Sequence, residues 1–232
     1  MSLLGVVAGF MTHEFAIAMD ELRQARSKLE ALAKKEPALR ALVERIDKHT
    51  KALNDFLTYS KAYIYGTATP PAKPYPAKPR VDQVIRVFGK YASDRDIKIT
   101  VAIPPALDAP FVPLSLYNGI CLNLYTNALK AVTAKAGPGP RKIHFQAANR
   151  DGQHTLIVSD TGIGIPGILR DRVFDPLFTT TSGNRDPLGS GMGLGLTLVK
   201  RAVETYDGEI AVVDPAQGYT TSVRVVLPLT AE

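Results

Sequence analysis

Apolar residues in the first 65 positions recur at the spacing of amphipathic helices. One series alternates steps of four and three residues, as a heptad seam does, and a second follows Pro37, which suits the first turn of a helix. This pattern predicts a helical hairpin over residues 1–65. One partner helix covers only half of each apolar stripe, so we expect a homodimer that pairs two hairpins in a four-helix bundle. The two series are Met11, Phe15, Ala18, Leu22, Ala25, Leu29 and Leu32, and then Leu39, Leu42, Ile46, His49, Leu53 and Phe56.

Proline interrupts the helical pattern between residues 66 and 79. The stretch reads GTATPPAKPYPAKP and contains five of the chain's seventeen prolines. Proline removes a backbone donor and fixes φ, which disfavours both a helix and a central strand. We therefore expect a stiff, extended linker that separates the hairpin from a second domain over residues 80–232.

Strand-like alternation and helical spacing are intermixed in residues 80–232, which predicts an α+β fold. The expected strands span residues 97–101, 142–147, 155–159, 209–213 and 221–227, and the expected helices span residues 113–135 and 193–206. Residues 149–152, Asn-Arg-Asp-Gly, suit a turn between two of these strands. Antiparallel hairpins mixed with helices favour an α/β two-layer sandwich.

The net charge of +6 is spread evenly along the chain. Residues 1–65, 66–79 and 80–232 each contribute +2, and no basic block stands out. Nucleic-acid surfaces need clustered basic residues, so we expect no nucleic-acid partner. The single cysteine, Cys121, excludes an internal disulfide and a cysteine-rich metal site. The sequence also has no apolar run long enough to span a bilayer and no secretory signal, and we expect a cytoplasmic location.

Asp160 ends an apolar run and opens the turn Asp160-Thr161-Gly162-Ile163-Gly164-Ile165-Pro166. A carboxylate at a strand end can accept a hydrogen bond from an adenine amino group, and glycines let the backbone approach a ligand closely. Gly162, Gly164 and Gly167 also match the dinucleotide fingerprint, but no second buried strand follows, so we reject a dinucleotide fold. Taken alone, the segment fits a structural glycine turn as well as a nucleotide site.

A second glycine-rich segment, Gly191-Met192-Gly193-Leu194-Gly195-Leu196, runs directly into an expected helix. Backbone N–H groups and the helix dipole at such a start favour binding of a phosphate. By itself, a flexible loop explains this segment equally well.

Polar residues also repeat along the helix expected over residues 113–135. Asn123, Asn127 and Lys130 fall on one face. Two amide oxygens and an ammonium in a row suit a magnesium–phosphate group, because Mg²⁺ prefers oxygen ligands. Considered alone, a solvated polar face is the simpler interpretation. The residues that can take the buried side are Ile120, Cys121, Leu124 and Ala128.

Taken in order, these segments resemble the sequence boxes of histidine kinases. Asn-x3-Asn-Ala-x-Lys, Asp-x-Gly-x-Gly, Phe-x-Pro-x-Phe and Gly-x-Gly-x-Gly-Leu are similar to the N, G1, F and G2 boxes. Histidine kinases belong with DNA gyrase to the Bergerat-type ATPase superfamily. The resemblance covers residues 80–232 and implies an ATP-binding catalytic domain.

The resemblance also implies a role for each matching position. Asn127 would coordinate Mg²⁺, Asn123 and Lys130 would support the metal and the phosphates, and Asp160 would bind the adenine of ATP. Arg185 would replace, as a contact to the γ-phosphate, the lysine that often ends the F box, where this chain has Thr181. The other implied ATP-binding residues shape the adenine turn or flank and close an ATP lid: Gly162, Gly164, Phe174, Phe178, Thr179, Thr180, Gly191, Gly193, Leu194 and Gly195.

Position 123 bears on the type of reaction. Gyrase-type ATPases have a glutamate there as the base for water, whereas this chain has Asn123, which cannot accept a proton. Lys130 is also the residue found in kinases. Both residues favour phosphoryl transfer over hydrolysis. Two alternatives stay open: a nucleotide-binding signalling module without kinase activity, and a gyrase-like ATPase.

His13 is the expected phosphoacceptor. It lies two residues from both Met11 and Phe15, so helical spacing turns it away from the apolar seam. A neutral imidazole is a nucleophile near physiological pH. His13-Glu14 before a helical hairpin resembles the dimerisation and phosphotransfer domain of the same kinases, which implies that Glu14 orients the ring or takes its proton.

This family resemblance implies a two-component reaction. His13 would be phosphorylated from Mg-ATP and would pass the phosphoryl group to an aspartate of a response regulator receiver domain. Twelve residues precede His13, so we expect a piece of a longer sensor. Any membrane association would come through an N-terminal sensor region outside this sequence.

Overall fold

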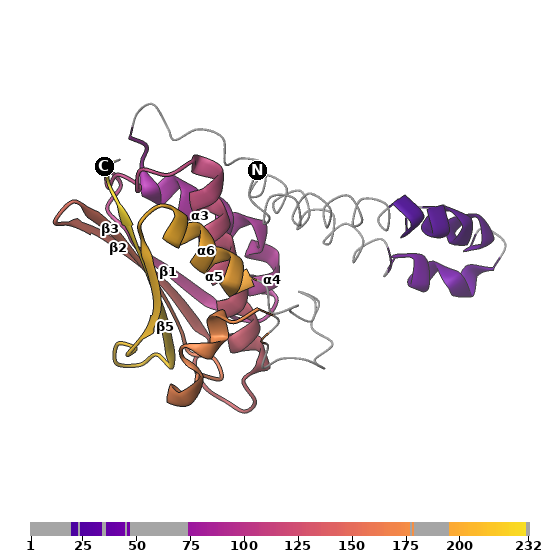
Figure 1. Cartoon of the computed structure of the whole chain (residues 1–232). Helices are drawn as coiled ribbons and strands as arrows, with labels where there is room; N and C mark the ends of the chain where they lie inside the picture. Colours follow the sequence, from indigo (N-terminus) through magenta and orange to yellow (C-terminus); the bar gives the residue numbers. More distant parts are fainter. Residues whose placement is uncertain are drawn as a thin grey trace. The chain divides into compact units, whose positions relative to one another are not determined.

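The computed structural model of the chain describes residues 20–22, 24–33, 36–44, 46, 74–176, 178 and 195–230 (Figure 1). The chain divides into two compact units, residues 1–68 and 69–232. Each unit is described by itself below. No helix among the described residues is long and apolar enough to cross a membrane.

The described part of the first unit is helical. Residues 20–22 and 24–33 are helical, a short 3-10 turn spans Pro37–Leu39, and the helix resumes at residues 40–44. The Glu36 amide caps the preceding helix by donating to the Leu32 carbonyl at 2.9 Å. Three leucines remain 37% to 55% exposed, which leaves apolar surface available within this unit: Leu22, Leu32 and Leu42. His13 and Glu14 lie outside the described residues.

The second unit contains a five-stranded sheet in the order β1-β2-β3-β5-β4. β1 and β2 are parallel, and the other neighbours are antiparallel. The strands are β1 (Lys98–Ala102), β2 (Lys142–Arg150), β3 (Gln153–Asp160), β4 (Glu209–Val213) and β5 (Thr221–Pro228). The helices are α3 (Ala77–Val87), α4 (Gly89–Ser93), α5 (Leu114–Ala134) and α6 (Gly195–Thr205), with the short 3-10 turns η2 (Gly167–Leu169) and η3 (Arg172–Phe174).

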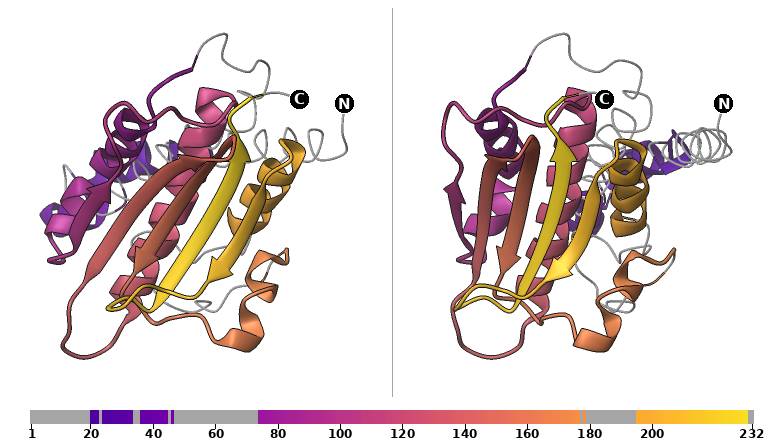
Figure 2. Two further views of the ribbon diagram at one scale, coloured as in Figure 1. Left: turned by 90° about the vertical axis from the view of Figure 1, so that its left-hand side faces the viewer. Right: turned by 60° about the vertical axis from the view of Figure 1, so that its left-hand side comes forward.

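Helices α3, α5 and α6 cover one face of the sheet and leave the other face open (Figure 2). The strands alternate accordingly: Ile143 and Phe145 of β2 are fully buried, His144 between them is half-buried, and Lys142 and Gln146 on either side are exposed. Between the layers, the buried Tyr125 of α5 makes edge-to-face ring contacts with Phe88 and Phe145, and the ring centroids lie 6.1 Å and 5.7 Å apart. The predicted α/β two-layer sandwich is therefore confirmed.

The predicted elements differ from the observed ones mainly at their ends. β2 extends to Arg150, so the turn expected over residues 149–152 shortens to Asp151-Gly152. Both residues have positive φ, at 51° and 74°, which is the geometry of a tight two-residue hairpin. The pattern-based analysis did not identify α3 and α4. α3 begins at Ala77, inside the expected linker, because Pro79 falls in the first helical turn, where no intrahelical donor is needed.

The chain enters the second unit through a short docked segment. The Ala77 amide donates to the Leu107 carbonyl at 2.9 Å, and the Ala109 amide donates to the Tyr75 carbonyl at 2.8 Å. Close by, the Tyr117 ring makes edge contacts with the rings of Tyr75 and of the buried His154. The start of the domain is thereby fixed against the end of the sheet where β3 begins.

Candidate functional site

Asp160 ends β3 as a buried carboxylate, with only 4% of its surface exposed. The Gly162 amide donates to its Oδ1 atom at 2.7 Å. Burial raises the pKa of Asp160 to about 6, against opposing effects of the Gly162 N–H, the Thr221 hydroxyl and the Lys135 ammonium. A buried acceptor with a single close backbone donor has lone pairs left for a ligand.

Thr221 faces Asp160 from the neighbouring strand. The two residues are partners in the β3–β5 register, and Thr221 is buried. Its hydroxyl lies near enough to lower the pKa of the carboxylate. The hydroxyl oxygen is nevertheless buried and forms no well-aligned hydrogen bond with a described residue. Such an atom is costly unless a ligand or water satisfies it. The sequence analysis missed Thr221, because only strand register reveals that it lies opposite Asp160.

The turn after Asp160 packs directly on the last turns of α5. A Cβ added to Gly162 would lie 2.4 Å from the Ala131 carbonyl carbon, so only glycine fits at this position without a backbone shift. The Ile163 amide donates to the Ala131 carbonyl at 3.2 Å. Gly164 has a φ of +76°, which favours glycine, and the Thr220 hydroxyl donates to the Gly162 carbonyl at 3.0 Å. These contacts fix the turn in place beside the carboxylate.

Thr161 ties the same turn to the start of β2. Its hydroxyl donates to the Pro140 carbonyl at 2.6 Å and accepts from the Lys142 amide at 2.9 Å. Its carbonyl accepts a hydrogen bond from Lys135 Nζ at 3.0 Å. Lys135 is the second residue that the sequence analysis missed, since nothing in its spacing from the boxes marks it.

The polar face predicted on α5 is present. Asn123, Asn127 and Lys130 are all half-buried along the helix. Asn123 Nδ2 donates to the Gly119 carbonyl at 2.9 Å, which directs its Oδ1 atom toward α6: a Cβ on Gly195, the first residue of α6, would lie 2.9 Å from that oxygen. The structure therefore brings the N-box face of α5 against the start of α6. The residues expected on the buried side, Ile120, Cys121, Leu124 and Ala128, are all buried.

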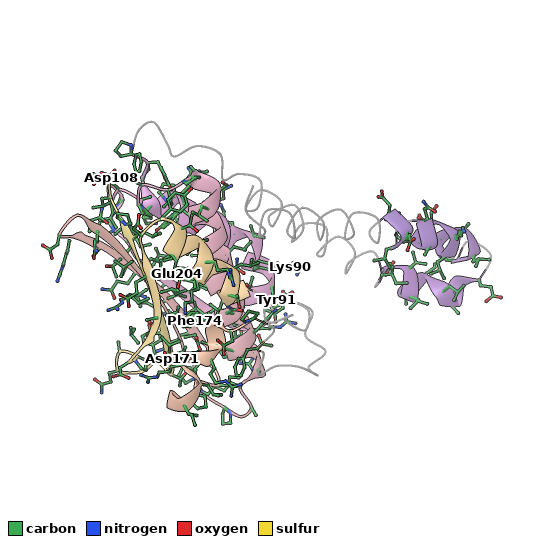
Figure 3. The ribbon with its side chains drawn as sticks, in the orientation of Figure 1. Lys90, Tyr91, Asp108, Asp171, Phe174 and Glu204 are labelled. Carbon is green, nitrogen blue, oxygen red and sulfur yellow. The ribbon has the colours of Figure 1, made fainter. Side chains whose placement is uncertain are left out.

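Phe174 anchors the segment that leads away from this region. It ends η3, is 7% exposed, and has Lys200 Nζ of α6 5.8 Å from its ring centroid. The Arg172 guanidinium lies 5.0 Å from the centroid of the Phe178 ring. Figure 3 places Asp171, beside η3, at the opposite end of the sheet from Asp108. The remaining expected site residues lie outside the described residues: Thr179, Thr180, Arg185, Gly191, Gly193 and Leu194.

The described site residues offer polar groups of the kind that nucleotide sites use. Asp160 and Thr221 offer an acceptor and an unsatisfied hydroxyl at the buried end of β3. Gly162 lets the turn pack directly on the α5 backbone, and Asn123 of α5 presents its amide oxygen to the start of α6. This donor set fits an adenine base and a metal-bound phosphate better than an apolar ligand.

Comparison with known proteins agrees with this geometry. Residues 116–231 match the family described as histidine kinase-, DNA gyrase B-, and HSP90-like ATPases. The sensor histidine kinase TmoS of Ectopseudomonas mendocina is 36% identical over 145 residues, which are 62% of this chain and 14% of that relative. The chain spans between 14% and 25% of the length of three curated relatives that it matches.

Two solved kinase structures share the fold. Full-length ShkA in complex with AMPPNP has a TM-score of 0.65 and 22% identity, and the match covers 97% of this chain and 46% of that chain. Histidine kinase ThkA in complex with the response regulator protein TrrA has a TM-score of 0.59 and 18% identity, covering 97% and 63%. The mixed sheet with its helical layer is thus the Bergerat-type ATPase fold. The chain belongs to the family of histidine kinase-, DNA gyrase B- and HSP90-like ATPases, and it contains a histidine kinase catalytic core.

Proposed function

We propose that this chain is the core of a two-component sensor histidine kinase that binds Mg-ATP, phosphorylates itself on His13 and passes the phosphoryl group to a response regulator. The observation that supports this most directly is the buried Asp160 carboxylate beside a turn that admits only glycine at position 162. Such a site suits the adenine base, whose amino group donates to Asp160 while a ring nitrogen accepts, directly or through water, from the Thr221 hydroxyl.

The phosphates are proposed to lie between α5 and the start of α6. Asn127 would hold Mg²⁺, and Asn123 and Lys130 would support the metal and the phosphate oxygens. The ion neutralises charge on the phosphate oxygens when it is bound. The backbone N–H groups at the start of α6 favour the same anion, with Gly191, Gly193 and Leu194 preceding Gly195 on the chain. Thr179, Thr180 and Arg185 complete the proposed lid.

Phosphoryl transfer would follow an in-line path. A neutral ring nitrogen of His13 attacks the γ-phosphorus of ATP, so a P–N bond forms while the P–O bond to ADP breaks. Glu14 accepts or orients the proton on the ring. Asn123 occupies the position where a hydrolase needs a base for water, which favours transfer over hydrolysis. A response regulator aspartate then receives the phosphoryl group, in keeping with the ThkA complex with a response regulator protein.

The hairpin is proposed to pair with a second copy. Leu22, Leu32 and Leu42 are 43%, 55% and 37% exposed within their own unit, and burying them would remove apolar surface from water. Pairing in a four-helix bundle buries such a stripe and makes the kinase a homodimer. We further propose residues 1–65 as the phosphotransfer domain and residues 80–232 as the catalytic domain, joined by a linker over residues 66–79 whose last three residues already form the first turn of α3.

Incubation with γ-labelled ATP and Mg²⁺ tests the proposal. The wild type and His13→Gln are compared, with His144→Gln as the matched control, because His144 is only half-buried on β2 and its ring nitrogen bonds the Thr100 hydroxyl. Acid-labile, base-stable label that disappears only in His13→Gln supports the kinase. Nucleotide binding without any label indicates a signalling module, and rapid phosphate release without a phosphoprotein indicates a gyrase-like ATPase.

A further inference from the structure

Lys135 follows the last residue of α5, and its side chain reaches back to the turn at residues 160–166. α5 ends at Ala134, and Lys135 has extended backbone geometry, with φ −66° and ψ 118°. Its half-buried ammonium donates to the Thr161 carbonyl at 3.0 Å, one residue from Asp160. A cation at this point also complements the partial negative charge at the C-terminal end of the helix.

The groups around Asp160 can be followed element by element. Its own turn supplies the Gly162 N–H, β5 supplies the Thr221 hydroxyl, and the β2 partner in register is the apolar Ile143. Lys135, the first residue after α5, adds a positive charge that acts on the carboxylate. Two more basic residues stand on β2 nearby, but Lys142 is exposed and His144 stacks on Tyr219 and bonds Thr100 on the open face.

We propose that Lys135 is a positioning residue for the base-binding carboxylate: it holds the Thr161 carbonyl and supplies the positive charge that keeps Asp160 an ionised acceptor for the adenine amino group. This inference rests on the proposed function of the site. The geometry behind it is the hydrogen bond from Lys135 Nζ to the Thr161 carbonyl and the packing of the same turn on α5.

Ionisation matters because of what adenine offers. Its exocyclic amino group is a donor, and an ionised carboxylate accepts from a donor more strongly than a neutral carboxyl group does. Burial already raises the pKa of Asp160 to about 6, so protonation competes with adenine just below neutral pH. Removing the Lys135 charge raises this pKa further, and the loss of affinity then begins at a higher pH.

Calorimetric titration with AMPPNP and Mg²⁺ between pH 5.5 and 8.5 tests the proposal on the full chain. Lys135→Met is expected to move the pH midpoint of affinity upward by less than about one unit, because Lys135 is the weakest of the groups that lower the pKa of Asp160. Lys135→Gln keeps a donor for the Thr161 carbonyl without the charge, and should show the same shift, whereas Lys135→Arg should restore the wild-type profile. Lys98→Met, which removes an exposed lysine at the start of β1, should leave the profile unchanged.

Each outcome separates this role from a structural one. Thermal unfolding of every variant is followed in parallel, because a variant that only weakens the fold lowers the melting temperature without moving the pH midpoint. An unchanged midpoint in folded Lys135→Gln overturns the role of the charge. A wild-type chain that binds no AMPPNP at any pH overturns the proposed function itself, which is a different result from normal binding that is insensitive to Lys135.

Discussion

The Oδ1 atom of Asn123 lies so near the start of α6 that a Cβ on Gly195 would stand 2.9 Å from it. Asn123 cannot simply move aside, since its Nδ2 atom bonds the Gly119 carbonyl one helical turn back. The last glycine of the G2 box and the first asparagine of the N box therefore fit each other. Two motifs about seventy residues apart in the sequence therefore meet in the fold, where we propose that phosphate and metal bind.

Gly195→Ala should therefore impair nucleotide binding more than stability. The new methyl group forces Asn123 to rotate and give up its bond to Gly119, which displaces an amide that we assign to the phosphates. We expect AMPPNP affinity to fall roughly tenfold, equivalent to about 1.4 kcal/mol. The matched control is Gly167→Ala, because a Cβ there meets nothing within 4 Å. Equal affinity in both variants would show that Asn123 plays no part in binding.

Gly162→Ala should destabilise the catalytic domain itself. Its Cβ would lie 2.4 Å from the Ala131 carbonyl carbon and 2.6 Å from the carbonyl oxygen, and backbone atoms of a long buried helix cannot yield cheaply. We expect a loss of about 1–3 kcal/mol in urea unfolding, as for other overpacked sites. Gly89→Ala, where a Cβ meets nothing within 4 Å at the start of α4, should unfold like the wild type or slightly later. A wild-type unfolding midpoint for Gly162→Ala would contradict the close packing.

Asp160 should lower the stability of the nucleotide-free domain at neutral pH. Its folded pKa is raised from 3.8 to about 6, so the native state binds a proton more tightly than the unfolded state does. The stability that comes from this tighter proton binding is fully present below about pH 4, and it is lost as the pH rises through about 6. Asp160→Asn removes this cost, and we expect it to be more stable than the wild type at pH 7 by about 2 kcal/mol.

Urea unfolding of both chains between pH 4 and pH 8 checks this linkage. The stability difference between Asp160→Asn and the wild type should shrink toward pH 4 and grow toward pH 7. The same substitution should abolish detectable AMPPNP binding, because the amide offers a weaker acceptor to the adenine amino group. A pH-independent difference would mean that Asp160 does not titrate in this range.

The hydrophobic pattern predicted the helices and strands that have a regular apolar period in their own sequence. α5 and the strands were placed within three residues of their observed ends, because one face of each packs in the core and leaves a period of 3.6 or 2. α3 was missed because Pro76 and Pro79 dominate its start, although both are compatible with the first turn of a helix. Asp160 and Gly162 were predicted from their motif, whereas Thr221 and Lys135 join the site only through strand pairing and through the way α5 ends.

Two tyrosines of α5 provide a further test of the fold, because both are buried and the hydroxyl of only one has a hydrogen-bond partner among the described residues. Burial raises the pKa of Tyr125, whose hydroxyl has no hydrogen-bond partner among the described residues. The Tyr117 hydroxyl, by contrast, lies 2.9 Å from His154 Nε2. Burial lowers the pKa of His154 to about 4, so its ring is neutral near pH 7, with Nδ1 donating to the Asn149 side chain and Nε2 accepting from Tyr117.

Tyr125→Phe should therefore leave stability unchanged or raise it by up to about 1 kcal/mol, since it removes an unsatisfied buried hydroxyl and keeps the ring contacts with Phe88 and Phe145. Tyr117→Phe should lower the free energy of unfolding by about 1–2 kcal/mol, because it leaves the buried His154 Nε2 without its hydrogen-bond donor. Urea unfolding at pH 7 compares the two substitutions, which delete the same atom from the same helix. Equal losses of stability would mean that the Tyr125 hydroxyl has a partner in solution, such as a buried water. A larger loss for Tyr117→Phe attributes the difference in stability to the hydrogen bond with His154.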